Sequence, residues 1–318
     1  MAGGVPEVGA VGRYRFRLAG ALASVAALAV ATYGGVLRYG FTGSDTLSLI
    51  ATARLRSAGD LARILTEPLM AGTSFVAHGL FYRPVSTLSF SLDGALWGLN
   101  PFGYHLTDLL LHVAVTVLVL LAVRRLREGR LGAAWLAAAL FTTHPILVES
   151  VPAISRRQDA LAALFLLLAL LLHLRWLAGR RGRWLAAALV AYLLALGAKE
   201  VAVVFPLLVL AHGTLFPADG ARALLRRGLR RAAPYLAATA LALAWRVALL
   251  GRVGGIIDES FGAWQDLQAG VAACWTYLVD LVFPVALIRL SPGRLAPAMA
   301  PAAGVAAGGL LLAIALGW

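Results

Sequence analysis

Charged and histidine side chains occur in an otherwise apolar part of the chain, at residues 141–165. This stretch reads FTTHPILVESVPAISRRQDALAALF, and long apolar runs precede and follow it. Its polar residues are His144, Glu149, Arg156, Arg157 and Asp159. Charged groups at membrane depth are costly, so they must face a cavity or one another. Arginine side chains can bind an anion, and a carboxylate can take up a proton.

A second charged pair, Lys199–Glu200, follows the apolar run 184–197. Lys199 is the only lysine among the 28 Lys and Arg residues, which indicates a specific pocket for a compact cation. The run gives about 21 Å of helix, shorter than the roughly 30 Å hydrocarbon core, so the pair is expected below the bilayer surface. A polar cavity open to lipid suits a substrate with a charged head and an apolar tail. The alternative is a buried ion pair that joins two helices.

The composition predicts an all-α, polytopic integral membrane protein with one membrane domain, residues 1–318. The 318 residues are 61% hydrophobic, with a mean hydropathy of +0.83. Soluble domains are usually about 45–50% apolar. The net charge of +13 is better explained by loop topology than by nucleic-acid binding. The single cysteine, Cys274, allows no internal disulfide and no thiolate metal site.

Nine transmembrane helices are predicted from the apolar runs and the arginine clusters between them. Arg13, Arg15 and Arg17 precede the first run, and further arginine clusters follow the second, fourth, sixth and eighth. A cytoplasmic N-terminus places every cluster inside, as the positive-inside bias requires. The predicted spans are 18–37, 105–123, 131–146, 159–178, 184–198, 201–216, 234–250, 268–288 and 295–317.

The first extracytoplasmic loop, residues 38–104, is too long for a simple tether. Residues 44–65 predict an amphipathic, interfacial helix, and residues 81–100 a second helix starting after Pro84. The topology gathers a mixed set of polar residues on the extracytoplasmic face. They are Asp45, His78, Arg83, His105, His144, Glu149, Arg157, Asp159, Lys199, Glu200, Asp258 and Glu259.

Four stretches resemble a known family. They are YRPVSTLSFSLDGALWGLNPFGYHLTDLLLH at 82–112, HPILVESVPAISRRQDALAALF at 144–165, LALGAKEVAVVFPLLVL at 194–210 and, more weakly, YLVDLVFPVAL at 277–287. Together they resemble the GT-C superfamily of polyprenyl-phosphate-sugar-dependent glycosyltransferases. The likeness is to the membrane part of O-mannosyltransferase-like proteins with tetratricopeptide repeats, and to their bacterial relatives. It covers residues 20–290 and, with the alanine, arginine and leucine bias, indicates a bacterial inner membrane.

The resemblance implies inverting transfer of a sugar from a polyprenyl-phosphate donor to a hydroxyl of a protein or glycolipid. It implies an acidic base in the first outer loop, which maps onto Asp45. It also implies basic residues near the donor phosphate. The candidates for binding donor or substrate are Arg83, His105, His144, Arg157 and Lys199.

Each candidate also has a structural interpretation. Asp45 can cap a helix beside Ser44, Arg83 can reach lipid headgroups, and His144 can cap a helix end. Three acids, Glu149, Asp159 and Glu200, are expected to form a structural network with the basic residues, in which Glu149 pairs with Arg157.

The histidines predict no metal site. His105 and His112 lie seven residues apart, which is not zinc-binding spacing. No cofactor is expected, although the oxygens of Asp45, Asp258 and Glu259 leave a divalent cation as an alternative.

Three features depart from the family pattern. Ser44–Asp45 stands where relatives often have two acids, Asp108 stands where they often have asparagine, and no tetratricopeptide repeats follow. The chain is therefore expected to be a fragment, a truncated product or a shortened relative. The alternatives to an enzyme are a non-catalytic membrane scaffold or a transporter of lipid or solute. The transporter is disfavoured because the polar residues gather on one side.

Overall fold

The computed structural model describes residues 8–41, 45–78, 80–127, 129–215, 221–251 and 263–282. Every regular element within these ranges is helical, which confirms the predicted all-α class. The chain divides into two compact units, residues 1–257 and 258–318. In the second unit, the structure describes one helix, α11 (Ala263–Val282). All other elements below belong to the first unit.

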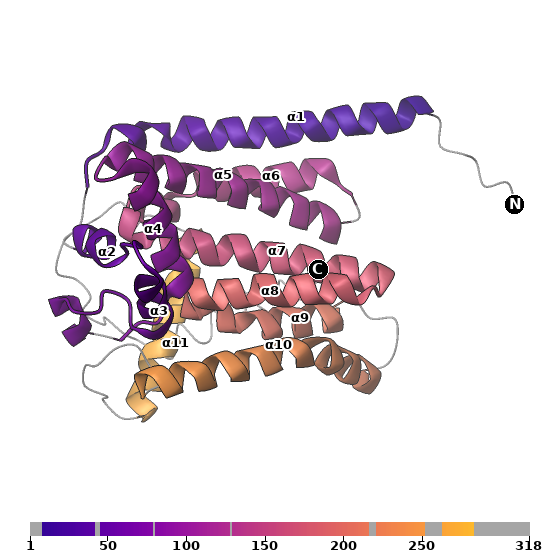
Figure 1. Cartoon of the computed structure of the whole chain (residues 1–318). Helices are drawn as coiled ribbons and strands as arrows, with labels where there is room; N and C mark the ends of the chain where they lie inside the picture. The colour runs from indigo at the N-terminus through magenta and orange to yellow at the C-terminus, as the bar shows by residue number, and fades with distance from the viewer. Residues whose placement is uncertain are drawn as a thin grey trace, which may run out of the picture. The chain divides into compact units, whose positions relative to one another are not determined.

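Long helices in the first unit pack as successive pairs (Figure 1). They are α1 (Val8–Tyr33), α5 (Pro101–Leu126), α6 (Leu131–Thr143), α7 (Arg157–Gly179), α8 (Gly182–Ala198), α9 (Phe205–Leu215) and α10 (Ala221–Leu250). Helix α5 packs on α6, α7 on α8, and α9 on α10. Helix α1 contacts both α5 and α6, and the pairs are joined through α5 with α7 and α8 with α10.

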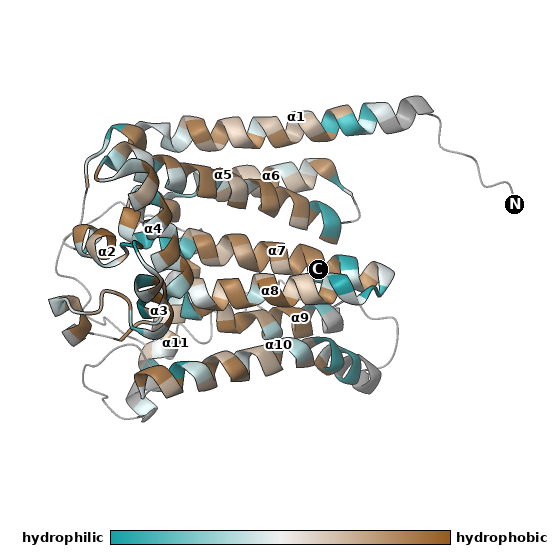
Figure 2. Cartoon of the chain, viewed as in Figure 1, coloured by the Kyte–Doolittle hydropathy of each residue, from teal (hydrophilic) through white to brown (hydrophobic). Residues whose placement is uncertain are grey.

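Four segments of the described chain are long and apolar enough to cross a membrane: Gly12–Arg38, Pro101–Leu126, Ile154–Gly179 and Arg226–Leu250. Three shorter apolar helices lie between them, at Leu131–Thr143, Gly182–Ala198 and Glu200–His212. Figure 2 shows the apolar colour along the middle of these helices and the hydrophilic colour toward their ends. The count of nine spans stays a prediction, and the ninth, 295–317, lies outside the described residues.

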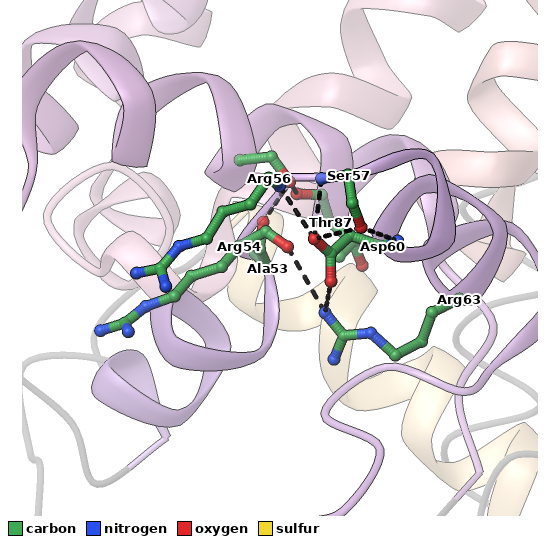
Figure 3. Close-up of polar contacts among 8 residues, drawn as sticks. Ala53, Arg54, Arg56, Ser57, Asp60, Arg63 and Thr87 are labelled. Carbon is green, nitrogen blue, oxygen red and sulfur yellow. Dashed lines mark hydrogen bonds and ion pairs between the residues drawn. The ribbon is translucent and has the colours of Figure 1, made fainter.

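The prediction of a single helix over residues 44–65 is wrong. The structure has two helices there, α2 (Thr46–Thr52) and α3 (Ala58–Thr66). Ser57 starts α3 in a capping box, accepting from the Asp60 N–H while the Asp60 carboxylate accepts from the Ser57 N–H (Figure 3). The Arg56 N–H also donates to this carboxylate and lowers the pKa of Asp60. Two N–H groups that a continuous helix would bond internally are therefore satisfied by Asp60.

A third helix of this region, α4 (Pro84–Trp97), begins where the sequence predicts, with proline in its first turn. It contacts α2, α3, α5, α7 and α8, and so lies across one end of the long helices. Short 3₁₀ turns join the helices at Gly34–Arg38, Ser74–His78, Pro145–Glu149, Ile154–Arg156 and Glu200–Val204.

Aromatic rings fill the contact among α7, α8, α9 and α10. The Tyr235 ring lies edge-on to those of Tyr192 and Phe205, at 5.7 and 5.1 Å between centroids. His173 Nδ1 lies 3.0 Å from the Tyr235 hydroxyl. Small residues such as Ala188 and Ala195 are also buried in this cluster, where they allow close helix approach.

We predict that Gly197→Ala destabilises the protein by about 1–3 kcal/mol through overpacking. A Cβ at Gly197 would lie 2.8 Å from Cγ2 of Val85, a β-branched side chain with little rotamer freedom. Thermal unfolding in detergent measures the effect. Gly20→Ala in α1 is the control: it meets no atom within 4 Å and should be neutral or stabilising. Equal stability of the two variants would show that α4 and α8 do not approach closely here.

Candidate functional site

The two ends of the long helices carry different charges. One end, at the starts of α5 and α7 and the end of α8, holds both acids and bases, and α4 crosses it. The other end, at the start of α1 and the links α5–α6 and α7–α8, is rich in arginine (Figure 2). The structure therefore gathers Arg83, His105, His144, Arg157, Asp159, Lys199 and Glu200 at one end.

Arg157 is buried at the first position of α7, with 1% of its surface exposed. Its guanidinium lies 2.6 Å from Oδ2 of Asp93 on α4 and 2.5 Å from Oδ1 of Asp108 on α5. It also donates to the Tyr104 carbonyl at 3.0 Å and lies 4.6 Å from the Phe90 ring centroid. Arg157 therefore joins three helices through two ion pairs, of which the one with Asp108 is also a hydrogen bond.

Glu149, which the sequence predicts to pair with Arg157, is not among the partners that the structure describes. The Glu149 side chain lies outside the described residues, whereas Asp93 and Asp108 hold the guanidinium. Asp93 was missed by the sequence analysis, and Asp108 was noted only as a departure from relatives. The signal that could have found them is an aspartate in an apolar helix, because such a group needs a partner.

Lys199 and Glu200 do not pair with each other. The Lys199 ammonium pairs with Asp159, which joins the end of α8 to the start of α7. Both Nε and Nη2 of Arg83 donate to Oε2 of Glu200, at 3.0 and 2.8 Å. Oε1 of Glu200 accepts from Arg246 of α10 at 3.1 Å. Glu200 therefore links the start of α4 to α10, and Arg246 is a further residue that the sequence analysis missed.

The two candidate histidines hold backbone groups. His105 is fully buried, and its Nε2 lies 3.2 Å from the Gly40 carbonyl, which fixes the chain shortly before α2. His144 Nδ1 accepts from the Ile146 N–H at 3.2 Å and caps the following 3₁₀ turn. His112 lies deeper in α5, with Nε2 2.8 Å from the Thr142 hydroxyl.

Asp45 stands at the N-cap position of α2, but its side chain makes no capping hydrogen bond. The residue is half-buried, and its backbone carbonyl accepts from the Leu49 N–H at 2.9 Å. Its carboxylate has no hydrogen-bond or ion-pair partner among the described residues. Helix α2 packs Leu49 and Ile50 in one cluster with Phe90 and Tyr104, which border Arg157. Asp45 is thus an uncommitted carboxylate on a helix packed beside the buried ion pairs.

Two cavities adjoin these charges. The smaller, about 120 Å³, lies between α5 and α7 and includes Asp108, His112, Ser150, Arg157 and Asp159 in its lining. The larger, about 520 Å³, is mostly apolar and lies between α8 and α10, with Tyr82, Glu200, Trp245 and Arg246 among its lining residues. Burial raises the pKa of Tyr82, so its hydroxyl stays protonated and donates to the Leu65 carbonyl at 2.7 Å.

No arrangement of three or more His, Cys, Asp or Glu side chains suited to a metal occurs in the part of the chain that the structure describes. The alternative cation site uses the oxygens of Asp45, Asp258 and Glu259, and residues 258 and 259 lie outside the described ranges.

No protein-family model and no solved structure matches the chain. "Protein O-mannosyl-transferase Tmtc1" of Drosophila melanogaster is 36% identical over 185 residues, 57% of this chain and 21% of that protein. "Protein O-mannosyl-transferase TMTC2" of Mus musculus is 44% identical over 97 residues, 30% of this chain and 11% of that protein. The chain is similar to protein O-mannosyl-transferases.

A third relative supports the same similarity. "Protein O-mannosyl-transferase TMTC1" of Mus musculus is 33% identical over 159 residues, 49% of this chain and 17% of that protein. The matched part spans about a fifth or less of these relatives' lengths. The apolar helices of the described chain support integration into a membrane.

We predict that Arg157→Gln lowers the free energy of unfolding by about 3–5 kcal/mol, because it leaves two buried carboxylates without their cation. Thermal or denaturant unfolding in detergent measures this change. Arg156→Gln is the matched control, since Arg156 is exposed and its loss should cost no more than about 0.5 kcal/mol. Similar stability of both variants would mean that Arg157 does not hold α4, α5 and α7 together.

Proposed function

We propose that the chain transfers a sugar, of the mannose type by similarity, from a polyprenyl-phosphate donor to a hydroxyl of a protein. The observation that carries the proposal is Asp45, a carboxylate without a structural partner among the described residues, on a helix packed beside clustered ion pairs. The named activity of the relatives supports a sugar transfer and a protein acceptor.

The chemistry needs one well-placed base. A sugar phosphate already has a good leaving group, whereas the acceptor hydroxyl must lose its proton as it attacks. In the proposed step, Asp45 takes that proton as the hydroxyl oxygen bonds to the anomeric carbon. The bond from this carbon to the phosphate oxygen breaks, and the phosphate leaves with the electron pair. One displacement of this kind inverts the anomeric centre.

Cations must meet the negative charge of the leaving phosphate. Arg83 and Arg246 share one carboxylate, Glu200, so this group carries one net positive charge. Lys199 is balanced by Asp159, and Arg157 is outnumbered by its two aspartates. We therefore propose that the phosphate binds near Arg83, where the charge is unbalanced. Lys199, the sequence neighbour of Glu200, is proposed as a second hydrogen-bond donor, while Arg157 and the histidines His105 and His144 position the site.

The proposed orientation follows from the charges at the two ends. The arginine-rich end is cytoplasmic by the positive-inside bias, so the mixed-charge end faces the extracytoplasmic side. For a bacterial inner membrane that side is the periplasm. We place α2 and α3 at that interface, because Leu61, Leu65, Arg54 and Arg56 are exposed. The Arg54 and Arg56 side chains point away from the capping box (Figure 3).

Asp45→Asn tests the proposal in membranes that contain the full chain. A lost general base should lower the transfer rate about 10²–10⁴-fold, while the thermal unfolding of the protein stays unchanged. Transfer of labelled sugar from a polyprenyl-phosphate donor to protein measures the rate. Glu67→Gln is the control, because Glu67 is an exposed carboxylate at the end of α3 and should keep the parent rate.

Undiminished transfer by Asp45→Asn would exclude Asp45 as the base. A folded parent chain that transfers no sugar from any polyprenyl-phosphate donor would contradict the enzyme and support the membrane scaffold instead.

A further inference from the structure

The larger cavity has the form of an apolar groove with one polar end. Its apolar wall comes from α8 and α10 and includes Leu193, Leu196, Leu241 and Leu243, with Val85 of α4. Its volume is about 520 Å³. Several of its residues are exposed in this structure, among them Leu241 at 69%. An apolar groove of this size on membrane helices suits a hydrocarbon chain.

The polar end of the groove favours an anion. Arg246 lines it and is 5% exposed, and its Nε has no hydrogen-bond partner among the described residues. The other two guanidinium nitrogens bind Glu200 and the Leu80 carbonyl, so the side chain is held in place. Arg83 adds a second cation to the single carboxylate of Glu200. A buried, rigid cation with a free donor is a site for a charge-assisted hydrogen bond.

Two aromatic residues lie where the apolar wall of the groove meets its polar end. Trp245 Nε1 donates to the Tyr82 hydroxyl at 3.0 Å, and both residues line the groove beside Arg246. Tyrosine and tryptophan have an apolar body and a polar edge, and they prefer the boundary between hydrocarbon and headgroup. The groove therefore runs from hydrocarbon to a headgroup region with net positive charge.

We propose that this groove binds the isoprenoid chain of the lipid-linked donor, with its phosphate beside Arg246. The inference rests on the proposed function, and it identifies α8 and α10 as the donor-lipid helices. One apolar groove that ends at one net positive charge matches a lipid with a single chain per phosphate. A phospholipid would need room for two chains. Arg246 thereby becomes a donor-binding residue, together with Arg83 and Lys199.

The test measures binding, so it does not depend on sugar transfer. Purified full-length chain in detergent is titrated with a polyprenyl monophosphate, and the complex is quantified by native mass spectrometry. Ala242→Trp should weaken binding at least about tenfold by filling the groove. Ala244→Trp, two residues along α10, is exposed and outside the lining, so it should bind like the parent.

A second variant guards against misfolding of the first. Leu193→Trp narrows the groove from α8, and Leu193 is exposed enough to accept a larger ring. It should weaken binding in the same way with unchanged thermal unfolding. If both groove variants and Ala244→Trp bind the polyprenyl phosphate equally well, the groove is not the lipid site.

Three further ligands test the headgroup and the chain. Uncharged polyprenol should bind more weakly than the polyprenyl phosphate, inorganic phosphate should not compete, and phosphatidic acid should bind equally to the parent and Ala242→Trp. Equal binding of polyprenol and polyprenyl phosphate would remove Arg246 from the site. Selective loss of phosphatidic acid in Ala242→Trp would assign the groove to a phospholipid.

The outcome is separable from that of the proposed function. Asp45→Asn should bind the polyprenyl phosphate like the parent, because α2 does not line the groove. A chain that binds this lipid but transfers no sugar would keep the groove and overturn the enzyme. If the parent transfers sugar and the groove variants bind the polyprenyl phosphate as well as the parent does, the enzyme is supported and the groove is excluded as the lipid site.

Discussion

The arrangement of this protein depends on one buried cation, Arg157, held between Asp93 and Asp108. The three side chains come from the starts of α7 and α5 and from α4, so their ion pairs determine where α4 crosses the helix ends. Once α4 is fixed, Arg83 at its N-cap position can reach Glu200, and Phe90 can pack against α2.

The charges at this end fall into two kinds. Arg157 lies in a fully buried group with an excess of acid, which suits a structural role because each charge is held by a partner. The group around Glu200 has an excess of base and adjoins the apolar groove between α8 and α10. Preorganised cations of this second kind are what a leaving phosphate requires. Both groups join helices, but only the group around Glu200 has a net positive charge beside a groove, and we therefore propose it as the one that meets the substrate.

Local signals in the sequence predicted much of the fold. Pro84 starts α4 as expected, because a fixed φ and a missing N–H suit the first turn of a helix. The helix over residues 44–65 was wrong because the capping box of Ser57 and Asp60 outweighed the continuous periodicity. The gathering of charges followed from loop topology, but their pairing did not. Arg157 lies 64 and 49 residues from Asp93 and Asp108, and no local rule selects these partners over Glu149.

A density map of the full chain with a polyprenyl-phosphate sugar bound would test the central claim most directly. We expect the phosphate at the mixed-charge end, within hydrogen-bond reach of cations near Glu200. We expect the Asp45 carboxylate to face the anomeric carbon, with room for an acceptor hydroxyl at about 3–3.5 Å. Sugar phosphate bound at the arginine-rich end, or an Asp45 side chain turned away from the sugar, would contradict it.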